Sequence, residues 1–127
     1  MTGTLIFSLL VNDVGVSAVA GDRVYPVVRP QAEDGVQLIY LLTGTNPSNS
    51  NDRPATTEKQ NVQVQIFARK YEQVDSLSPK VRNALEAWKD NQESIVFETE
   101  SDDFDAETVQ YVRILDFRVR RVRNFNP

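Results

Sequence analysis

The chain has 127 residues, 40% of them hydrophobic and 25% charged, with a formal net charge of −4. Two domains of half this length would each bury too small a core, so we expect one domain over residues 1–127. The chain has no cysteine and no histidine, which excludes disulfides, the usual zinc and haem sites, and every catalytic triad that uses either residue. We therefore expect no enzyme activity and no cofactor.

Two short helices are predicted near the N-terminus. Residues 4–11 place their apolar side chains on one stripe, with Thr2 or Thr4 as a cap. Residues 14–20 give a second short helix, which Gly21 ends. The first apolar run is far below the roughly 18 residues that span a bilayer and lacks the basic flank of a signal peptide. The sequence thus predicts a soluble, non-secreted protein with no membrane partner.

Strands follow in the next third of the chain. Residues 23–28, "RVYPVV", favour an edge or bent strand, because Pro26 cannot donate a ladder hydrogen bond. Residues 36–44 form a near-continuous apolar run, which indicates a strand covered on both faces. Residues 62–69 alternate apolar and polar side chains, typical of a half-buried strand. Residues 45–59 lie between these two strands and have few apolar side chains that could be buried. Their composition therefore predicts a long polar loop.

The C-terminal half predicts one helix and two strands. Residues 72–90 carry a helical apolar stripe, and Pro79 allows either a helix that starts at Ser78–Pro79 or a longer one kinked there. Residues 94–101 and 108–122 read as strands joined around "DDFDAE". The order predicts an α+β fold: a mainly antiparallel sheet of about four to five strands with helices packed on one face. The predicted core contains Leu9, Val36, Ile39, Val64, Ile66, Leu85, Trp88 and Ile114.

Charge is unevenly spread over the last two strands. Residues 98–107 contain six acids and no base, whereas residues 113–123 contain five arginines and one acid. In an extended chain Arg113, Arg121 and Arg123 point to one side and Arg118 and Arg120 to the other. Three readings stay open: arginines paired with acids across the hairpin, a subunit interface, or a nucleic-acid arm. The net negative charge weighs against the last.

The acidic run also has a partial resemblance to a calcium loop. Asp103, Asp105 and Glu107 stand at alternate positions. However, Thr108 occupies the position that needs a glycine, and Ile114 the position that needs a glutamate. A solvated turn is the better interpretation, and no metal site is predicted.

The order of these segments resembles a known family. "GDRVYP" at residues 21–26 is followed by a proline–glutamine pair, by "VQVQIFA" at 62–68 with Tyr71 shortly after, and by a closing "YVRILDFRVR" at 111–120. This running pattern resembles the tail completion proteins of long-tailed bacteriophages, also called tail terminator or tail-to-head joining proteins. The resemblance extends over almost the whole chain, apart from the length and polarity of residues 45–59.

The resemblance implies a structural virion protein, made in the host cytoplasm, that caps the tail tube at the head–tail junction. Such proteins commonly form a ring of six copies; the implied partners are further copies, the tail tube protein and neck or connector proteins, with DNA only in passage. Alternatives are a neck connector or head-closure protein, or a small nucleic-acid-binding module. The candidate oligomer interface comprises Arg118, Arg120, Arg121, Glu98, Glu100, Asp102, Asp103 and Asp105. The candidate partner-contact loop comprises Asn46, Asn49, Asn51 and Arg53.

Overall fold

A computed structural model describes residues 2–28, 35–50, 53–90 and 93–122. In these ranges, three helices and five strands follow one another along the chain. Their order is α1 (Thr2–Asn12), α2 (Val14–Ala20), β1 (Val24–Pro26), β2 (Gln37–Ser50), β3 (Arg53–Ala68), α3 (Tyr71–Glu86), β4 (Glu93–Asp105) and β5 (Gln110–Val122).

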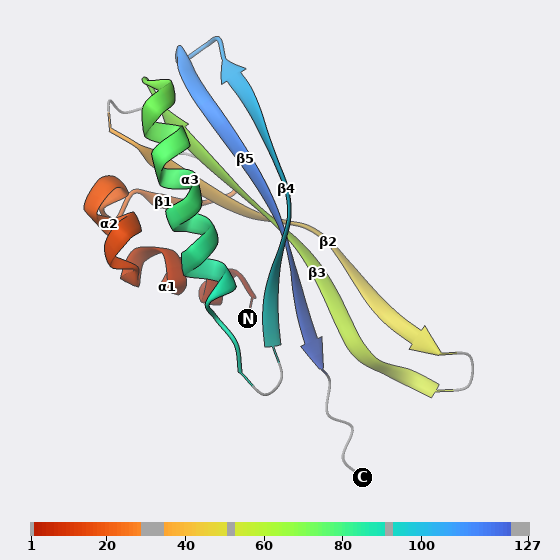
Figure 1. The fold of residues 1–127 in the computed structure, drawn as a ribbon. Helices are drawn as coiled ribbons and strands as arrows, with labels where there is room; N and C mark the ends of the chain where they lie inside the picture. The colour runs from red at the N-terminus through yellow and green to blue at the C-terminus, as the bar shows by residue number, and fades with distance from the viewer. Residues whose placement is uncertain (1, 29–34, 51–52, 91–92, 123–127) are drawn as a thin grey trace.

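The strands form one sheet in the order β1-β2-β3-β5-β4. Short β1 pairs parallel to β2, and every other neighbouring pair is antiparallel. The helices lie together on one side of this sheet (Figure 1). The predicted α+β fold, a mainly antiparallel sheet with helices on one face, is confirmed.

The core lies between the sheet and the helices. Alternate residues of β3 (Val62, Val64 and Ile66) point toward the helices and are buried, as the alternation in the sequence predicts. The buried stripe of α3 packs on them and consists of Val74, Leu77, Val81, Ala84 and Leu85. The predicted core is right for Val36, Ile39, Val64, Ile66 and Leu85, but Leu9, Trp88 and Ile114 are only partly buried.

The opposite side of the sheet, here called the open face, carries a small apolar cluster of its own. Ile39, Phe67 and Val112 are buried there, with Leu41 and Ile114 packed against them. Ile114 lies on this side because Arg113 and Leu115, its neighbours in β5, point toward the helices. A partly apolar open face on a small protein is a feature that protein contacts commonly use.

The predicted loop at residues 45–59 is wrong. The sequence favours a polar loop, but β2 continues to Ser50 and β3 begins at Arg53, so most of this segment is paired strand. The pairs run from Gly44 opposite Asn61 outward to Ser50 opposite Arg53. Backbone hydrogen bonds hold a hairpin together whatever its side chains, so a polar composition does not exclude strands. The end of this hairpin projects beyond the helices (Figure 1).

The structure shows where α2 ends and where α3 begins, two boundaries considered in the sequence analysis. Gly21 ends α2, as predicted, with a positive φ of 59° that favours glycine, but its ψ of −130° differs from that of the predicted left-handed cap. Pro79 lies inside α3, which starts at Tyr71, so the longer helix is the correct reading and a start at Ser78 is wrong. Proline has no N–H, so it leaves one helical carbonyl without its usual donor. The exposed side of α3 tolerates this loss because water can replace that donor.

Among the described residues, no single helix is long and apolar enough to cross a membrane. Only α1 and α2 taken together have the required length and composition, and these two are bent by 81°.

Candidate functional site

The two charged strands form one hairpin, β4 and β5, at the edge of the sheet. Its register sets Asp102 opposite Arg113 and Glu93 opposite Arg121. A register shift between Phe97 and Thr99 lies midway along the pair. The hairpin therefore brings part of the acidic run directly beside part of the arginine run.

The arginines alternate between the two faces, as the sequence predicts. Arg113 and Arg121 flank the buried side chains of β5 on the helix side, whereas Arg118 and Arg120 lie on the open face. Arg123 lies outside the described residues. The arginines thus form no single basic stripe of the kind that follows a nucleic-acid backbone.

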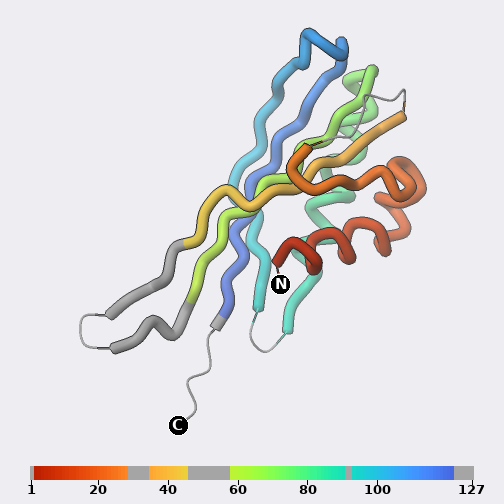
Figure 2. The backbone as a smooth tube through the Cα atoms, turned by 180° about the vertical axis from the view of Figure 1, so that it is seen from behind, coloured from red at the N-terminus to blue at the C-terminus, as the bar shows by residue number. Residues whose placement is uncertain are grey.

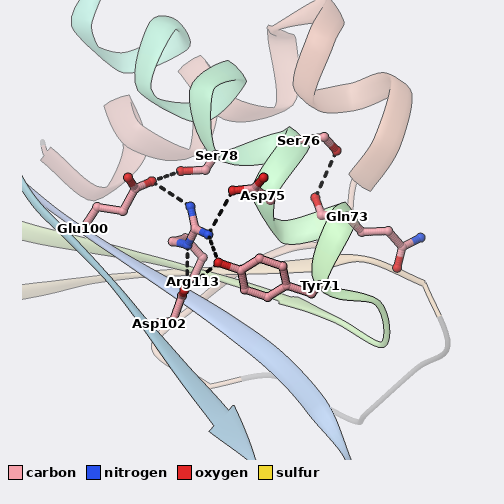
Figure 3. Close-up of polar contacts among 8 residues, drawn as sticks. All are labelled: Tyr71, Gln73, Asp75, Ser76, Ser78, Glu100, Asp102 and Arg113. Carbon is pink, nitrogen blue, oxygen red and sulfur yellow. Dashed lines mark hydrogen bonds and ion pairs between the residues drawn. The ribbon is translucent and has the colours of Figure 1, made fainter.

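Arg113 is the centre of a polar cluster beneath α3 (Figure 3). Its side chain is only 8% exposed. The guanidinium donates to Glu100 Oε2 at 3.0 Å, Tyr71 Oη at 3.0 Å and Asp75 Oδ1 at 3.2 Å, and also to Asp102. Because a guanidinium offers five N–H donors in a rigid fork, one side chain joins β4, β5 and α3.

Two hydroxyl groups from α3 complete this cluster. Ser78 donates to Glu100, and Tyr71 Oη donates to Asp102 Oδ2 at 2.7 Å. The Arg113 guanidinium also lies over the Tyr71 ring, 5.6 Å from its centroid. All the groups around Arg113 are therefore hydrogen-bonded, which is what a buried charge needs to be stable.

The cluster shifts the ionisation of its members. The hydrogen bond from Ser78, together with Arg113, lowers the pKa of Glu100. The hydrogen bond from Tyr71, together with Arg113, lowers the pKa of Asp102. The same bond to Asp102 raises the pKa of the Tyr71 phenol. Although burial opposes it, hydrogen bonding to Asp102, Glu100 and Asp75 raises the pKa of Arg113. All four groups keep their ordinary neutral-pH charge states.

Two further arginines pair with acids along the hairpin. Arg121 donates twice to Glu93 Oε2, at 2.8 and 3.1 Å, and contacts Thr2 Oγ1 at 3.4 Å, which ties the start of α1 to the sheet. Arg118 lies 3.7 Å from Glu98, and both side chains are more than one-third exposed. Such an exposed pair contributes about 0–1 kcal/mol at most.

These contacts divide the candidate interface residues into those that pair within the chain and those that do not. Glu100, Asp102 and Arg121 are engaged inside the chain, and the Arg118–Glu98 pair is on the surface. Pairing across the hairpin, one of the three readings of the charge pattern, therefore accounts for three of the arginines. Arg120 and Asp103 are exposed, and no ion pair involves either among the described residues.

Sequence reasoning missed the partners of Arg113 on α3, namely Tyr71, Asp75 and Ser78. The one available signal was Arg113 itself, which shares its side of the strand with Leu115 and Phe117. An arginine on an apolar side of a strand predicts a buried ion pair, because an unpaired buried charge is costly.

The turn of the hairpin is held by Asp105. Its carboxylate accepts from the Glu107 N–H at 3.1 Å and from Thr108 Oγ1 at 2.9 Å. This is the turn chemistry that aspartate commonly supplies. The interpretation of the acidic run as a turn is nevertheless wrong for residues 98–105, which belong to strand β4 and pair with β5. Across the part of the chain that the structure describes, no group of three acidic side chains could hold a metal ion.

A hollow of about 300 Å³ opens on the open face next to this turn. We call it the acidic hollow: Phe67, Val112 and Ile114 form its apolar floor, and Asp103 and Asp105 stand at its rim. The opposite end of the same face is basic, because Lys59 of β3 lies directly opposite Arg120 of β5.

The candidate contact residues of the predicted loop lie on the projecting hairpin. Asn46 and Asn49 belong to β2 and Arg53 to β3, whereas Asn51 lies outside the described residues. The hairpin brings the three strand residues toward the same end of the molecule.

Comparison with known proteins assigns the family. One solved chain, titled "Virion of native gene transfer agent (GTA) particle", is similar in fold, with a TM-score of 0.69 and 16% identity over 92% of this chain and 91% of that chain. No curated protein sequence matches. The family described as Tail completion protein gp17 matches residues 4–121. That match covers all the helices and strands described above except the first two residues of α1 and the last residue of β5, and so the chain belongs to the tail completion protein family.

Proposed function

We propose that this protein is a structural part of the virion that closes the end of the tail tube as a ring of six copies and joins the tail to the neck. The family match over residues 4–121 carries this proposal. The similarity in fold to a chain of a virion particle supports it as well.

The surface of the molecule is suited to such a ring. A cyclic contact brings two different surfaces of the same chain together. The open face offers an acidic hollow with an apolar floor at one end and the Lys59–Arg120 pair at the other. Opposite charges of this kind set the register and partner of a contact, while apolar groups contribute affinity.

The arrangement favours passage of DNA over binding of DNA. Arg113, Arg118 and Arg121 each have a carboxylate within 4 Å, so much of their charge is neutralised within the chain. The net charge of −4 adds repulsion of phosphate groups. A nucleic-acid-binding module would need a basic field over a whole face.

Particles assembled in the absence of this protein test the proposal. We expect DNA-filled heads and separate, unjoined tails, and purified protein added to that mixture should restore joined particles. A neck or head-closure protein would instead leave heads that lose their DNA. Joined particles that form normally without the protein would contradict the proposed function.

A further inference from the structure

The outer side of β2 is covered by β1 over only a short length. β1 ends at Pro26, and its pairing with β2 runs from Leu38 to Tyr40. Along the rest of β2, as far as the structure describes the chain, no strand pairs with this side. Residues 41–50, here called the β2 edge, therefore present backbone N–H and C=O groups that a further strand could bond.

Leu42 is the first residue of the β2 edge whose backbone points outward. The Leu38 N–H donates to the Arg23 carbonyl at 2.9 Å, and the Tyr40 carbonyl accepts from the Val27 N–H at 2.9 Å. Backbone groups of alternate residues face the same side of a strand, so the Leu42 N–H and C=O face outward as well. The side chain of Leu42 is 52% exposed. An apolar side chain beside outward backbone groups is typical of an edge that another chain covers.

The β2 edge also lacks the charged side chains that usually protect a free strand. The 14 residues of β2 include no acid and no base. Natural proteins prevent unwanted pairing with charges, prolines, bulges or very short edge strands. Here only Pro47 and the register shift after Leu42 interrupt the edge. Little in the sequence of β2 therefore opposes pairing with a further strand.

β4, the last strand in the sheet order, forms the opposite edge (Figures 1 and 2). A bridge between Lys89 and Ser94 occupies the start of its outer side. Past Ser94, the described ranges contain no strand that pairs with that side. Residues 95–104, here called the β4 edge, are therefore an uncovered stretch of the same length as the β2 edge.

Charge decides which of these edges can meet. β4 contains six acids and no base, so two β4 edges would place like charges side by side, which is destabilising. The β2 edge has no charge of its own, and Lys59 stands directly behind it on β3. The β4 edge of one copy is therefore better matched by the β2 edge of another copy than by a second β4 edge.

The ring sets the direction in which the two edges would run. β2, β3, β5 and β4 are successive antiparallel neighbours, so β2 and β4 point in opposite directions within one copy. Rotation about a ring axis leaves the direction of a strand along that axis unchanged. The β2 edge of one copy would therefore meet the β4 edge of the next copy antiparallel.

The longest overlap of the two edges brings Leu42 beside Phe104. In that overlap the end of β4 at Asp105 lies against the end of β1, and Leu42 falls within one residue of Phe104. Both side chains are on the helix side of the sheet, because Leu42 is opposite Val62 and Phe104 is opposite Tyr111. Phe104 is 47% exposed, so the pairing would cover an exposed apolar side chain on each copy.

We infer that the β2 edge of one copy pairs antiparallel with the β4 edge of the next copy, with Leu42 packed on Phe104. This inference rests on the proposed ring and identifies how its neighbours are joined. Each copy has one edge of each kind, so the contact is heterologous and repeats until the ring closes. The open faces of neighbouring copies then meet along this seam, and the acidic strand of one copy lies two strands from Lys59 of the other.

Disulfide trapping tests the contact, because the chain has no cysteine of its own. In the full chain carrying Leu42→Cys and Phe104→Cys, mild oxidation of assembled rings should give a ladder of covalently linked copies. The matched control is Val14→Cys with Phe104→Cys, since Val14 is an 82% exposed residue of α2. This control and each single variant should give no ladder. Dimers formed by Leu42→Cys alone would show that the β2 edge pairs with itself, which overturns the inference.

The sign of a charge at Leu42 gives a second readout. Phe104 lies between Asp103 and Asp105, so Leu42→Asp should weaken each contact about tenfold, seen as a lower ring fraction by native mass spectrometry. Leu42→Lys should keep the ring fraction near that of the wild type. Val14→Asp and Val14→Lys are the matched controls and should have no effect. Thermal unfolding checks that each variant folds.

Amide exchange at Leu42 reports on the edge itself. The Leu42 N–H should exchange quickly in the free monomer and at least about tenfold more slowly in the ring. The Val64 N–H, within a strand paired on both sides, should be protected in both states. Slow exchange of Leu42 in the monomer would show that the chain covers its own edge, and that result overturns the inference.

The outcomes separate this inference from the proposed function. Rings that form without a link between positions 42 and 104, and that respond equally to Asp and Lys at position 42, overturn the inference and leave the ring standing. Linked copies with the expected charge dependence, in a protein whose removal still allows joined particles, support the contact and contradict the proposed function. If neither rings nor linked copies form, both are wrong.

Discussion

Arg113 of β5 and Glu100 of β4 form a partly buried ion pair beneath α3, with Nη1 3.0 Å from Oε2. The pair joins the edge of the sheet to the helical layer, because Arg113 also reaches Tyr71 and Asp75 while Ser78 donates to Glu100 (Figure 3). The edge hairpin, which also carries the acidic hollow, is thereby fixed relative to the core.

Replacing Arg113 should destabilise the fold. Arg113→Ala leaves Glu100 and Asp102 without their main partner beside α3. We expect a loss of about 2–3 kcal/mol in the free energy of unfolding, at the lower end for a buried pair because the carboxylates remain partly exposed. Urea unfolding measures it. Arg118→Ala, which removes an exposed pair, is the control and should cost less than about 1 kcal/mol; equal losses would contradict the central role of Arg113.

The same cluster predicts how stability depends on pH. Folding lowers the pKa of Glu100 and of Asp102, so the unfolded chain binds more protons than the folded chain in the acidic range. Their contribution is present above their ordinary pKa values of about 4 and is lost as the pH falls through the lowered values. Unfolding free energies measured from pH 6 to pH 3 should decline less steeply for Glu100→Gln with Asp102→Asn than for the wild type. Parallel curves would contradict this.

The core between α3 and the sheet should carry much of the stability. Leu85 of α3 and Ile66 of β3 are both fully buried. Leu85→Ala or Ile66→Ala should reduce the unfolding free energy by roughly 2–5 kcal/mol, because each leaves a cavity. Leu42→Ala, at an exposed position of β2, is the control with an expected change within about 0.5 kcal/mol. A similarly small change at Leu85 would show that the helix packs differently.

Assembly should depend on the basic end of the open face. Arg118→Glu with Arg120→Glu alters only exposed charges, so the monomer should keep its thermal unfolding temperature within a few degrees. Ring formation should be lost, because like charges would then face the acidic rim of the neighbour. Adding Asp103→Lys should restore it in part, as measured by analytical ultracentrifugation. Normal assembly of the double variant would place the interface elsewhere.

Much of the fold follows from patterns within single segments. The alternation through Val62, Val64 and Ile66 predicts the buried side of β3, and the stripe through Leu77, Val81 and Leu85 predicts the buried side of α3. Both patterns report burial directly, because a period of two or 3.6 places apolar groups on one face.

Other features depend on contacts that no single segment shows. Residues 45–59 form paired strands without an apolar pattern, since their ladder is made by backbone groups. The partners of Arg113 come together only when α3 packs across β4 and β5, with Asp75 and Arg113 separated by 38 residues. The sequence predicts complementary charges on the hairpin, whereas only the structure separates the engaged Glu100 and Asp102 from the exposed Asp103.

Electron microscopy of the complete particle, with this protein located by a fused tag, tests the central claim most directly. We expect a closed ring of six copies between the tail tube and the neck, each copy contacting the next through its open face. Density for the protein only inside the capsid or at the far tip of the tail would contradict the account.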